Sequence, residues 1–217
     1  MIGGWSLSEV TSYYLLLSVA GSFLIAHIDE SVAIEDIYEG GLVKYVIRPF
    51  SYFWDLFFGE LSWRIFQGLI GIGILFIIGI SFQLLISFVS SPLHIFMTFI
   101  SFLLAYTLSF LFKMILGFSA FWLTEFRGIQ SSAEIILLIF AGFIVPLQFL
   151  PTQIKEISFL LPFAYMVYFP ILAIQGRLEY VELLGVLGMQ ILWIGFFACV
   201  YRLMWNRGIK LFTGVGQ

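Results

Sequence analysis

The chain has 217 residues, of which 61% are apolar and 11% are charged, and its formal net charge is −3. Soluble domains are about 45–50% apolar and about 25% charged, so this composition excludes an ordinary soluble fold. The small negative charge favours neither nucleic acid nor an acidic partner. We therefore expect an integral membrane protein.

Apolar stretches long enough to cross a bilayer as helices occur five times along the chain. The predicted spans are residues 11–28, 64–88, 94–112, 133–150 and 182–201. A β-barrel would need segments of about ten residues that alternate between apolar and polar. Residues 70–78 are instead apolar at both odd and even positions, which favours a helix. The sequence therefore predicts an all-α integral membrane protein with about five transmembrane helices in a single domain, residues 1–217.

Lysine and arginine are divided unevenly between the two sides that alternating spans define. One side carries only Lys155 and Arg177, and the excess on the other side marks it as cytoplasmic. The C-terminal tail, residues 202–217, is therefore predicted to be cytoplasmic, with the N-terminus outside. The cytoplasmic set is Lys44, Arg48, Arg64, Lys113, Arg127, Arg202, Arg207 and Lys210.

The position of Lys113 leaves one helix boundary open. Residues 114–124 are apolar but follow this lysine on the cytoplasmic side. Either Lys113 lies inside a longer helix and extends its ammonium group to the interface, or the third span begins later than His94.

The predicted cytoplasmic loop, residues 29–63, opens with a short acidic helix. Ser31 can cap this helix, Glu35 and Asp36 suit its positive N-terminal end, and Gly40 can end it. The pattern predicts a defined helical piece rather than a plain connection.

Two interpretations of this acidic helix remain open. With Ile34 and Ile37 on one face, it is either an amphipathic helix on the membrane surface or a docking helix for a cytoplasmic partner. Cytoplasmic leaflets are anionic and attract lysine and arginine, so the acidic residues disfavour the membrane surface.

The predicted outer segment, residues 146–176, is punctuated by prolines. They interrupt a run rich in Leu, Phe, Tyr and Ile, and each removes a backbone donor. Irregular backbone at membrane depth must be buried in protein or line a cavity. We therefore expect short re-entrant helices there. The prolines are Pro146, Pro151, Pro162 and Pro170.

The sequence contains no catalytic motif that we can identify. A phosphate-binding loop ends in Gly-Lys followed by Ser or Thr, and no Gly-Lys pair occurs in the chain. No Gly-x-Ser-x-Gly motif is present, and Cys199 has no histidine near it in sequence. Any ATP is therefore expected on another subunit.

Metal and proton chemistry are also disfavoured. His27 and His94 are predicted near opposite membrane faces, so they cannot share a metal ion. The predicted spans hold few ionisable residues, and Glu134 and Glu182 fall at span ends, where we interpret them as boundary residues. We expect no metal site, no cofactor bound by this chain and no enzyme activity of its own.

Several motifs resemble the permease subunits of ABC-2 type transporters, in particular the bacterial branch of small separate-chain permeases. The likeness covers nearly the whole chain. The motifs are Ile-Glu-Asp-Ile-Tyr-Glu-Gly-Gly-Leu at 34–42, Ile-Arg-Pro at 47–49, Phe-Trp at 121–122, Gly-x-x-x-Pro-Leu-x-x-Leu-Pro at 142–151, Leu-Pro-Phe at 161–163, Phe-Pro at 169–170 and Trp-x-x-Gly-x-x-x-Phe-x-x-x-Gly at 205–216.

The resemblance implies partners and a coupling role. In that family two permease subunits, the same or different, pair and dock on two copies of a separate ATP-binding subunit, which holds ATP and Mg²⁺. The loop after the family's second span is the coupling helix seated on the ATPase. Carried over to this sequence, that role falls on Ser31, Ile34, Glu35, Asp36, Ile37, Tyr38, Glu39, Gly40, Leu42, Arg48 and Pro49.

The resemblance also implies an exporter in a bacterial inner membrane, with the proline-rich outer segment near its exit gate. Family members usually have six spans, so this chain is expected to begin at the family's second span. Two other classes stay open: a membrane anchor or assembly factor that transports nothing, and an intramembrane enzyme that modifies a lipid. The implied gate residues are Gly142, Pro146, Pro151, Pro162 and Pro170.

Overall fold

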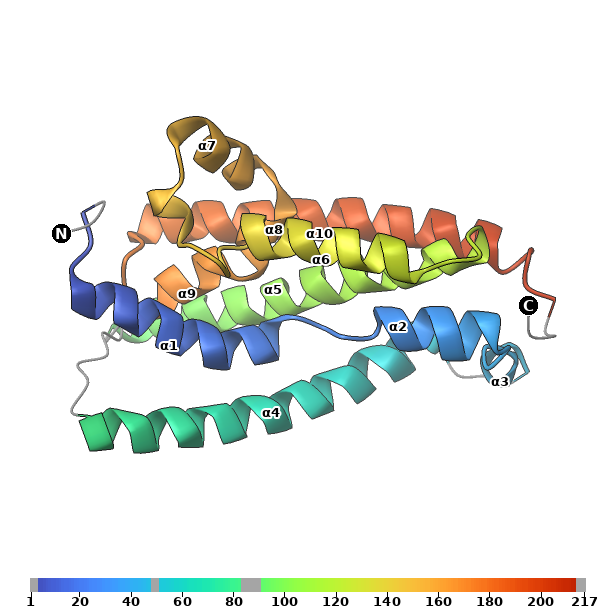
Figure 1. Ribbon diagram of the computed structural model, residues 1–217, viewed down its shortest axis with the longest axis horizontal. Coiled ribbons are helices and arrows are strands. Elements are labelled where there is room, and N and C mark those ends of the chain that lie inside the picture. The colour runs from blue at the N-terminus through green and yellow to red at the C-terminus, as the bar shows by residue number, and fades with distance from the viewer. Residues whose placement is uncertain (1–3, 48–50, 83–90, 214–217) are drawn as a thin grey trace.

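The long helices of the protein run along one common axis (Figure 1). The computed structural model describes residues 4–47, 51–82 and 91–213, and every regular element in these ranges is helical. The predicted all-α class is confirmed. α1 begins at the left of Figure 1, which we call the N-terminal end of the molecule, and α10 finishes at the right, the C-terminal end.

The helices fall into long ones and short connecting pieces. The long helices are α1 (Leu7–Leu24), α4 (Tyr52–Phe82), α5 (Pro92–Phe118) and α10 (Tyr180–Gly208), with α6 (Arg127–Phe140) of intermediate length. The short pieces are α2 (Asp29–Ser31), the π-helix η1 (Val32–Tyr38), α3 (Val43–Val46), the 3₁₀ turns η2 (Ser119–Phe121) and η3 (Leu147–Phe149), α7 (Thr152–Leu160), α8 (Pro162–Met166) and α9 (Tyr168–Ile174).

The described part of the chain has four helices long and apolar enough to cross a membrane. A fifth candidate is a bent pair, Thr152–Leu160 with Pro162–Ile174, whose axes differ by 69°. The predicted multi-pass architecture is therefore confirmed, with four spans, or five if the bent pair counts as one. The four are Leu7–Tyr38, Tyr52–Ser81, Pro92–Phe121 and Tyr180–Gly208.

The predicted fourth span, residues 133–150, does not form one helix. α6 ends at Phe140, and its 14 residues extend about 21 Å, short of the roughly 30 Å hydrocarbon core. Gly142 follows with φ +84°, a left-handed conformation that ends helices. A Cβ there would also lie 2.7 Å from the Tyr13 hydroxyl oxygen, so conformation and space both require glycine.

Two other helices are longer than predicted. α4 already begins at Tyr52, so residues 52–63, predicted as part of a loop, form its first turns. α5 continues past Lys113 to Phe118. Lys113 therefore lies inside a longer helix, as one alternative predicted, but its ammonium group is buried against Asp29 and does not extend to the interface.

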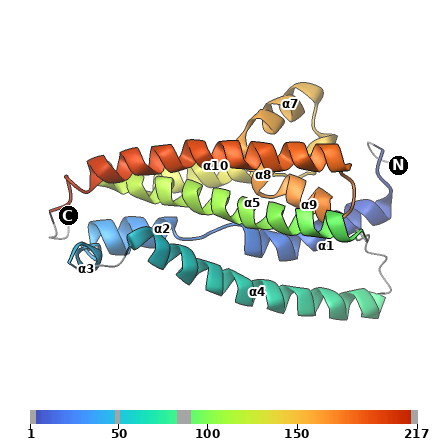
Figure 2. The ribbon, with the colours of Figure 1, turned by 180° about the vertical axis from the view of Figure 1, so that it is seen from behind.

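α5 is the centre of the structure. α10 packs along it, and α1, α2 with η1, α8 and α9 also contact it. Figure 2 shows α10 and α5 side by side, whereas α4 lies at the edge of the molecule. The principal partner of α4 is α1. Buried apolar side chains form two clusters, a larger one toward the N-terminal end and a smaller one toward the C-terminal end.

Candidate docking segment and polar groove

A short-helix segment, residues 29–47, lies at the C-terminal end of the bundle. It follows a non-helical break, residues 25–28, and comprises α2, η1 and α3. In η1 the backbone bonds join residues five apart, as where the Glu39 N–H donates to the Ile34 carbonyl at 2.9 Å. Gly40 then adopts φ +82° and ends the helix, as predicted.

The prediction that Ser31 caps this segment is wrong. Ser31 is the last residue of α2, and its Oγ donates to the Ile28 carbonyl at 3.1 Å. The helix begins at Asp29, directly after the buried Ile28, so Ser31 already lies inside it.

One face of the short-helix segment is exposed and acidic. Glu35 and Glu39 are exposed, and Ile34 and Tyr38 lie half-buried beside them. Ile37, in contrast, is only 5% exposed. Ile34 and Ile37 were predicted to share one face, but the wider turn of the π-helix separates them.

The opposite face is fixed to α4. Asp36 is buried, accepts a hydrogen bond from the Tyr52 hydroxyl at 2.8 Å and lies 3.4 Å from Lys44 Nζ. Tyr45 donates its hydroxyl to Asp55 at 2.8 Å, and burial together with this carboxylate raises the pKa of the Tyr45 phenol, which keeps it a neutral donor. Asp36 therefore anchors the segment and is not open to another protein.

The segment is also fixed to α5 and α6. Lys113 Nζ lies 3.1 Å from Asp29 Oδ2, and both side chains are 3% exposed. Gln130 Nε2 donates to the same oxygen at 3.3 Å. A Cβ on Gly117 would lie 2.7 Å from Val32 Cγ1, so η1 and α5 approach this closely because residue 117 is glycine.

A second ion pair holds α4 against the non-helical break that follows α1, residues 25–28. The buried Arg64 donates from Nε to Glu60 at 2.7 Å, and from Nη1 to the Ser22 carbonyl at 3.2 Å and Gln67 Oε1 at 2.6 Å. The His27 backbone N–H donates to the same Glu60 carboxylate at 2.8 Å. The break after α1 is therefore stabilised by the side chains of Glu60 and Arg64, which bond the His27 N–H and the Ser22 carbonyl.

The sequence interpretation missed this polar cluster. Glu134 was interpreted as a span boundary residue and the position of Lys113 was left open, yet the two side chains lie 3.8 Å apart. Asp29 and Lys113 are 84 residues apart in sequence, so only the fold reveals their pairing. The sequence did contain one indication of this cluster, because charged residues of opposite sign recur in its otherwise apolar segments.

The residues assigned to a gate lie around the N-terminal end of the bundle. Tyr13 donates its hydroxyl to the Gly142 carbonyl at 2.8 Å. Trp5, Tyr13 and Phe149 pack edge to face, with ring centroids 5.4–5.8 Å apart. Pro146, Pro162 and Pro170 are buried, whereas Pro151 is exposed before α7.

The remaining site predictions are placed as follows. Leu42 is fully buried, and Gly40 is half-buried at the end of η1. Arg48 and Pro49 lie outside the described residues. His27 lies in the break after α1, and His94 lies in the first turn of α5. Within the described ranges, no group of three or more His, Cys, Asp or Glu could hold a metal ion.

Comparison with known proteins places the chain in a family. Residues 1–216 match the family model described as ABC-2 family transporter protein. Neither the curated proteins nor the solved structures gave a match. The match covers nearly the whole chain and agrees with the several membrane-spanning helices of the structure. The chain therefore belongs to the ABC-2 family of transporter proteins, as the resemblance of its motifs predicted.

Proposed function

We propose that this chain is the membrane-spanning permease subunit of an ATP-driven exporter in a bacterial inner membrane. The observation that carries the proposal is the short-helix segment, whose exposed face presents Glu35 and Glu39 while its buried face is bonded to the bundle. Such a segment suits a partner that carries complementary lysine and arginine side chains and pushes on the bundle.

Membership of the family implies an ATP-binding partner, and our proposal adds its copy number and a second permease subunit. A separate ATP-binding subunit, in two copies, holds ATP and Mg²⁺ and supplies the hydrolysis, and a second permease subunit, the same or different, completes the pathway. This chain itself binds no cofactor and no nucleic acid. The lipid bilayer surrounds its long apolar helices.

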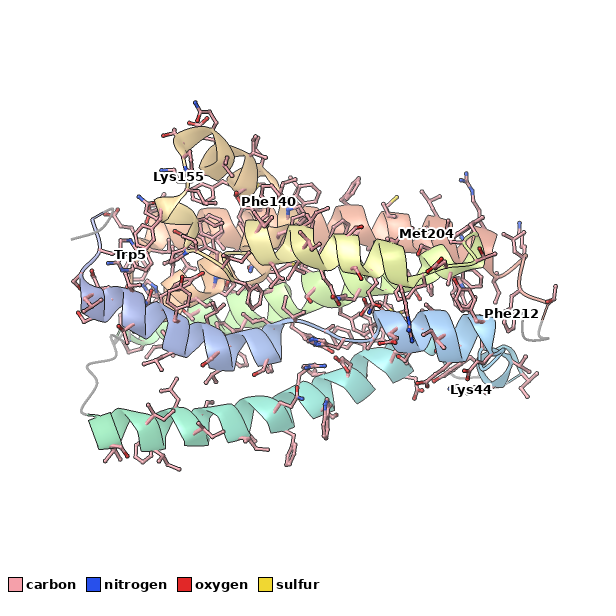
Figure 3. All side chains as sticks on the ribbon, in the orientation of Figure 1. Trp5, Lys44, Phe140, Lys155, Met204 and Phe212 are labelled. Atoms are coloured by element: carbon pink, nitrogen blue, oxygen red, sulfur yellow. The ribbon has the colours of Figure 1, made fainter. Side chains whose placement is uncertain are left out.

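The distribution of charge supports a cytoplasmic C-terminal end. Lysine and arginine gather at that end, where Figure 3 places Lys44, whereas the figure places Lys155 toward the N-terminal end. Arg177 also lies there, paired with Glu9 in the first turn of α1. Excess positive charge marks the cytoplasmic side of a membrane protein. The short-helix segment then faces the compartment that contains ATP. The other described members of the predicted cytoplasmic set are Arg64, Lys113, Arg127, Arg202, Arg207 and Lys210, and Arg48 lies outside the described residues.

Force from the partner would pass to α5 rather than to α1. The segment is joined to α5 by the Asp29–Lys113 pair and the close approach at Gly117, whereas a non-helical break, residues 25–28, separates it from α1. We expect a rigid shift of α5 with α10 to rearrange the N-terminal end, where the Tyr13 hydroxyl donates to the Gly142 carbonyl in this conformation.

Capture of the ATP-binding subunit tests the proposal. The tagged chain is purified in mild detergent after crosslinking in the membrane, as wild type and as Glu35→Lys and Glu39→Lys. Both residues are exposed, so reversal of their charge leaves the packing intact. We expect the wild type to recover an ATP-binding subunit and each variant to lose most of it.

Glu156→Lys on α7 is the matched control, since it makes the same change of charge at an exposed site near the N-terminal end. Asp36 is avoided, because its loss would unfold the segment. Recovery of no ATP-binding subunit with the wild type contradicts the proposed function. Equal recovery with all three variants contradicts docking through this face.

A further inference from the structure

A groove of about 720 Å³ opens where α1 breaks, between α4 and α6 with α5 at its floor. Ionisable groups inside a membrane protein are costly and usually serve a purpose. This groove collects several of them next to apolar side chains, and the docking role proposed above uses only the Asp29–Lys113 pair. Its lining residues include His27, Arg64, Gln67, Lys113 and Glu134.

The two cations of the groove are already neutralised. Arg64 is 6% exposed and bonds Glu60 at 2.7 Å. Lys113 is 3% exposed and lies 3.1 Å from Asp29. Each positive charge therefore has a closer carboxylate of its own and offers little attraction to an anion in the groove.

Glu134 is the third carboxylate of this cluster. Its side chain is 51% exposed, and the nearest cation that the described chain offers it is Lys113, at 3.8 Å. The cluster has three carboxylates and two cations, so one negative charge is not neutralised. This charge belongs to Glu134, whose side chain is the most exposed of the three carboxylates. A cation about 4 Å away is attracted to this carboxylate, and water screens part of the attraction because the side chain is half-exposed.

The groove is apolar farther along its length. α6 runs from the C-terminal end toward the middle of the bundle, so Leu137 and Leu138 follow Glu134 in the direction of the N-terminal end. Phe143 lies beyond them, and a Cβ on Gly21 would lie 3.0 Å from its ring. A ligand in the groove therefore meets charge at one end and hydrocarbon at the other.

We propose that this groove binds an amphiphilic monocation, with its charged group at Glu134 and its apolar body against Leu137, Leu138 and Phe143. That this cation is the exported substrate rests on the function proposed above; the binding itself does not. A second cavity, about 460 Å³ between α1, α4 and α5, has only apolar side chains around it and offers no charge selection.

A pair of ions with similar shape and opposite charge provides the test. The purified chain in nanodiscs of neutral lipid is dialysed against tetraphenylphosphonium or tetraphenylborate, with empty nanodiscs to subtract partition into lipid. We expect saturable binding of the cation and none of the anion. Glu134→Gln should weaken cation binding about tenfold, and Glu134→Lys should abolish it.

Glu156→Gln on α7 is the matched control, since it removes an exposed carboxylate far from the groove. Equal binding of both ions, or unchanged cation binding in Glu134→Gln, overturns the proposal. The same proteins are also assayed for capture of the ATP-binding subunit by crosslinking in the membrane before purification. Capture without selective cation binding overturns only the groove proposal, whereas cation binding without capture overturns the exporter function and leaves the groove proposal standing.

Discussion

α4 and α5 are closely similar in length and mean hydropathy, but the protein uses them differently. Both candidate spans have 30 residues, with mean hydropathies of 1.9 and 2.1, yet 11% of the most apolar part of α4 is buried against 50% for α5. Lipid tails are as apolar as these side chains, so hydrophobicity does not draw one helix to another in a bilayer. Something other than apolar content decides which helix becomes the centre.

Polar and small residues along the whole length of α5 make the difference. Gln190 on α10 donates to Ser101, and Ser109 accepts from the Ala26 N–H at 3.0 Å. Lys113 and Gly117 then fix the short-helix segment. On α4 the charged anchors, Glu60 and Arg64, lie in the first half, and the helix beyond them faces outward with isoleucine, leucine and phenylalanine.

Removal of the Lys113 ammonium should have the largest effect on this arrangement. Lys113→Met leaves Asp29 buried without its cation, and breaking a buried pair on one side costs about 3–5 kcal/mol. We expect a matching loss in the free energy of unfolding in mixed detergent micelles and a lower yield of the folded chain. Lys210→Met, at an exposed lysine in the tail, should change nothing.

The double variant Asp29→Asn/Lys113→Met separates the charge from the packing. It removes both ions, so most of the lost stability should return. If the double variant is as unstable as Lys113→Met, the cost comes from packing, and the ion pair does not explain why α5 is central.

Sequence patterns were sufficient for the parts of the fold that depend on local composition. Long apolar runs identified α1, α4, α5 and α10 as membrane helices, and the prolines of residues 146–176 indicated short helices. Burial of α5 and exposure of α4 could not be predicted, because the two candidate spans have the same length and nearly the same mean hydropathy. The distinguishing contacts join residues far apart in sequence.

The candidate site was only partly predictable for the same reason. The acidic run Glu35–Glu39 marked the short-helix segment, but it did not show that Asp36 points inward to Tyr52. Glu134 was interpreted as a boundary residue because the helix was expected to begin at residue 133, whereas α6 begins six residues earlier, at Arg127. The misplaced boundary concealed the groove.

The same substitution in each helix sharpens the comparison. Phe110 on α5 is 0% exposed, and Phe76 on α4 is 66% exposed. Phe110→Ala should cost about 3 kcal/mol, because it leaves a cavity that neighbouring side chains cannot fill. Phe76→Ala should cost less than about 0.5 kcal/mol if that face meets lipid. The free energy of unfolding measures both, and a large cost for Phe76→Ala would mean that α4 packs against another protein in the sample.

A glycine pair gives the smallest and most local test. A Cβ on Gly117 of α5 would lie 2.7 Å from Val32 Cγ1 and 3.0 Å from the Asp29 carbonyl oxygen, whereas a Cβ on Gly73 of α4 meets nothing within 4 Å. Gly117→Ala should lower the free energy of unfolding by about 1–2 kcal/mol through overpacking, and Gly73→Ala should be neutral or stabilising, because alanine favours a helix more than glycine does.

The Val32 methyl group cannot retreat without moving η1. Gly117→Ala should therefore also weaken the capture of the ATP-binding subunit, although residue 117 is buried and cannot touch it. Unchanged capture in a destabilised Gly117→Ala variant would show that the short-helix segment docks independently of its contact with α5.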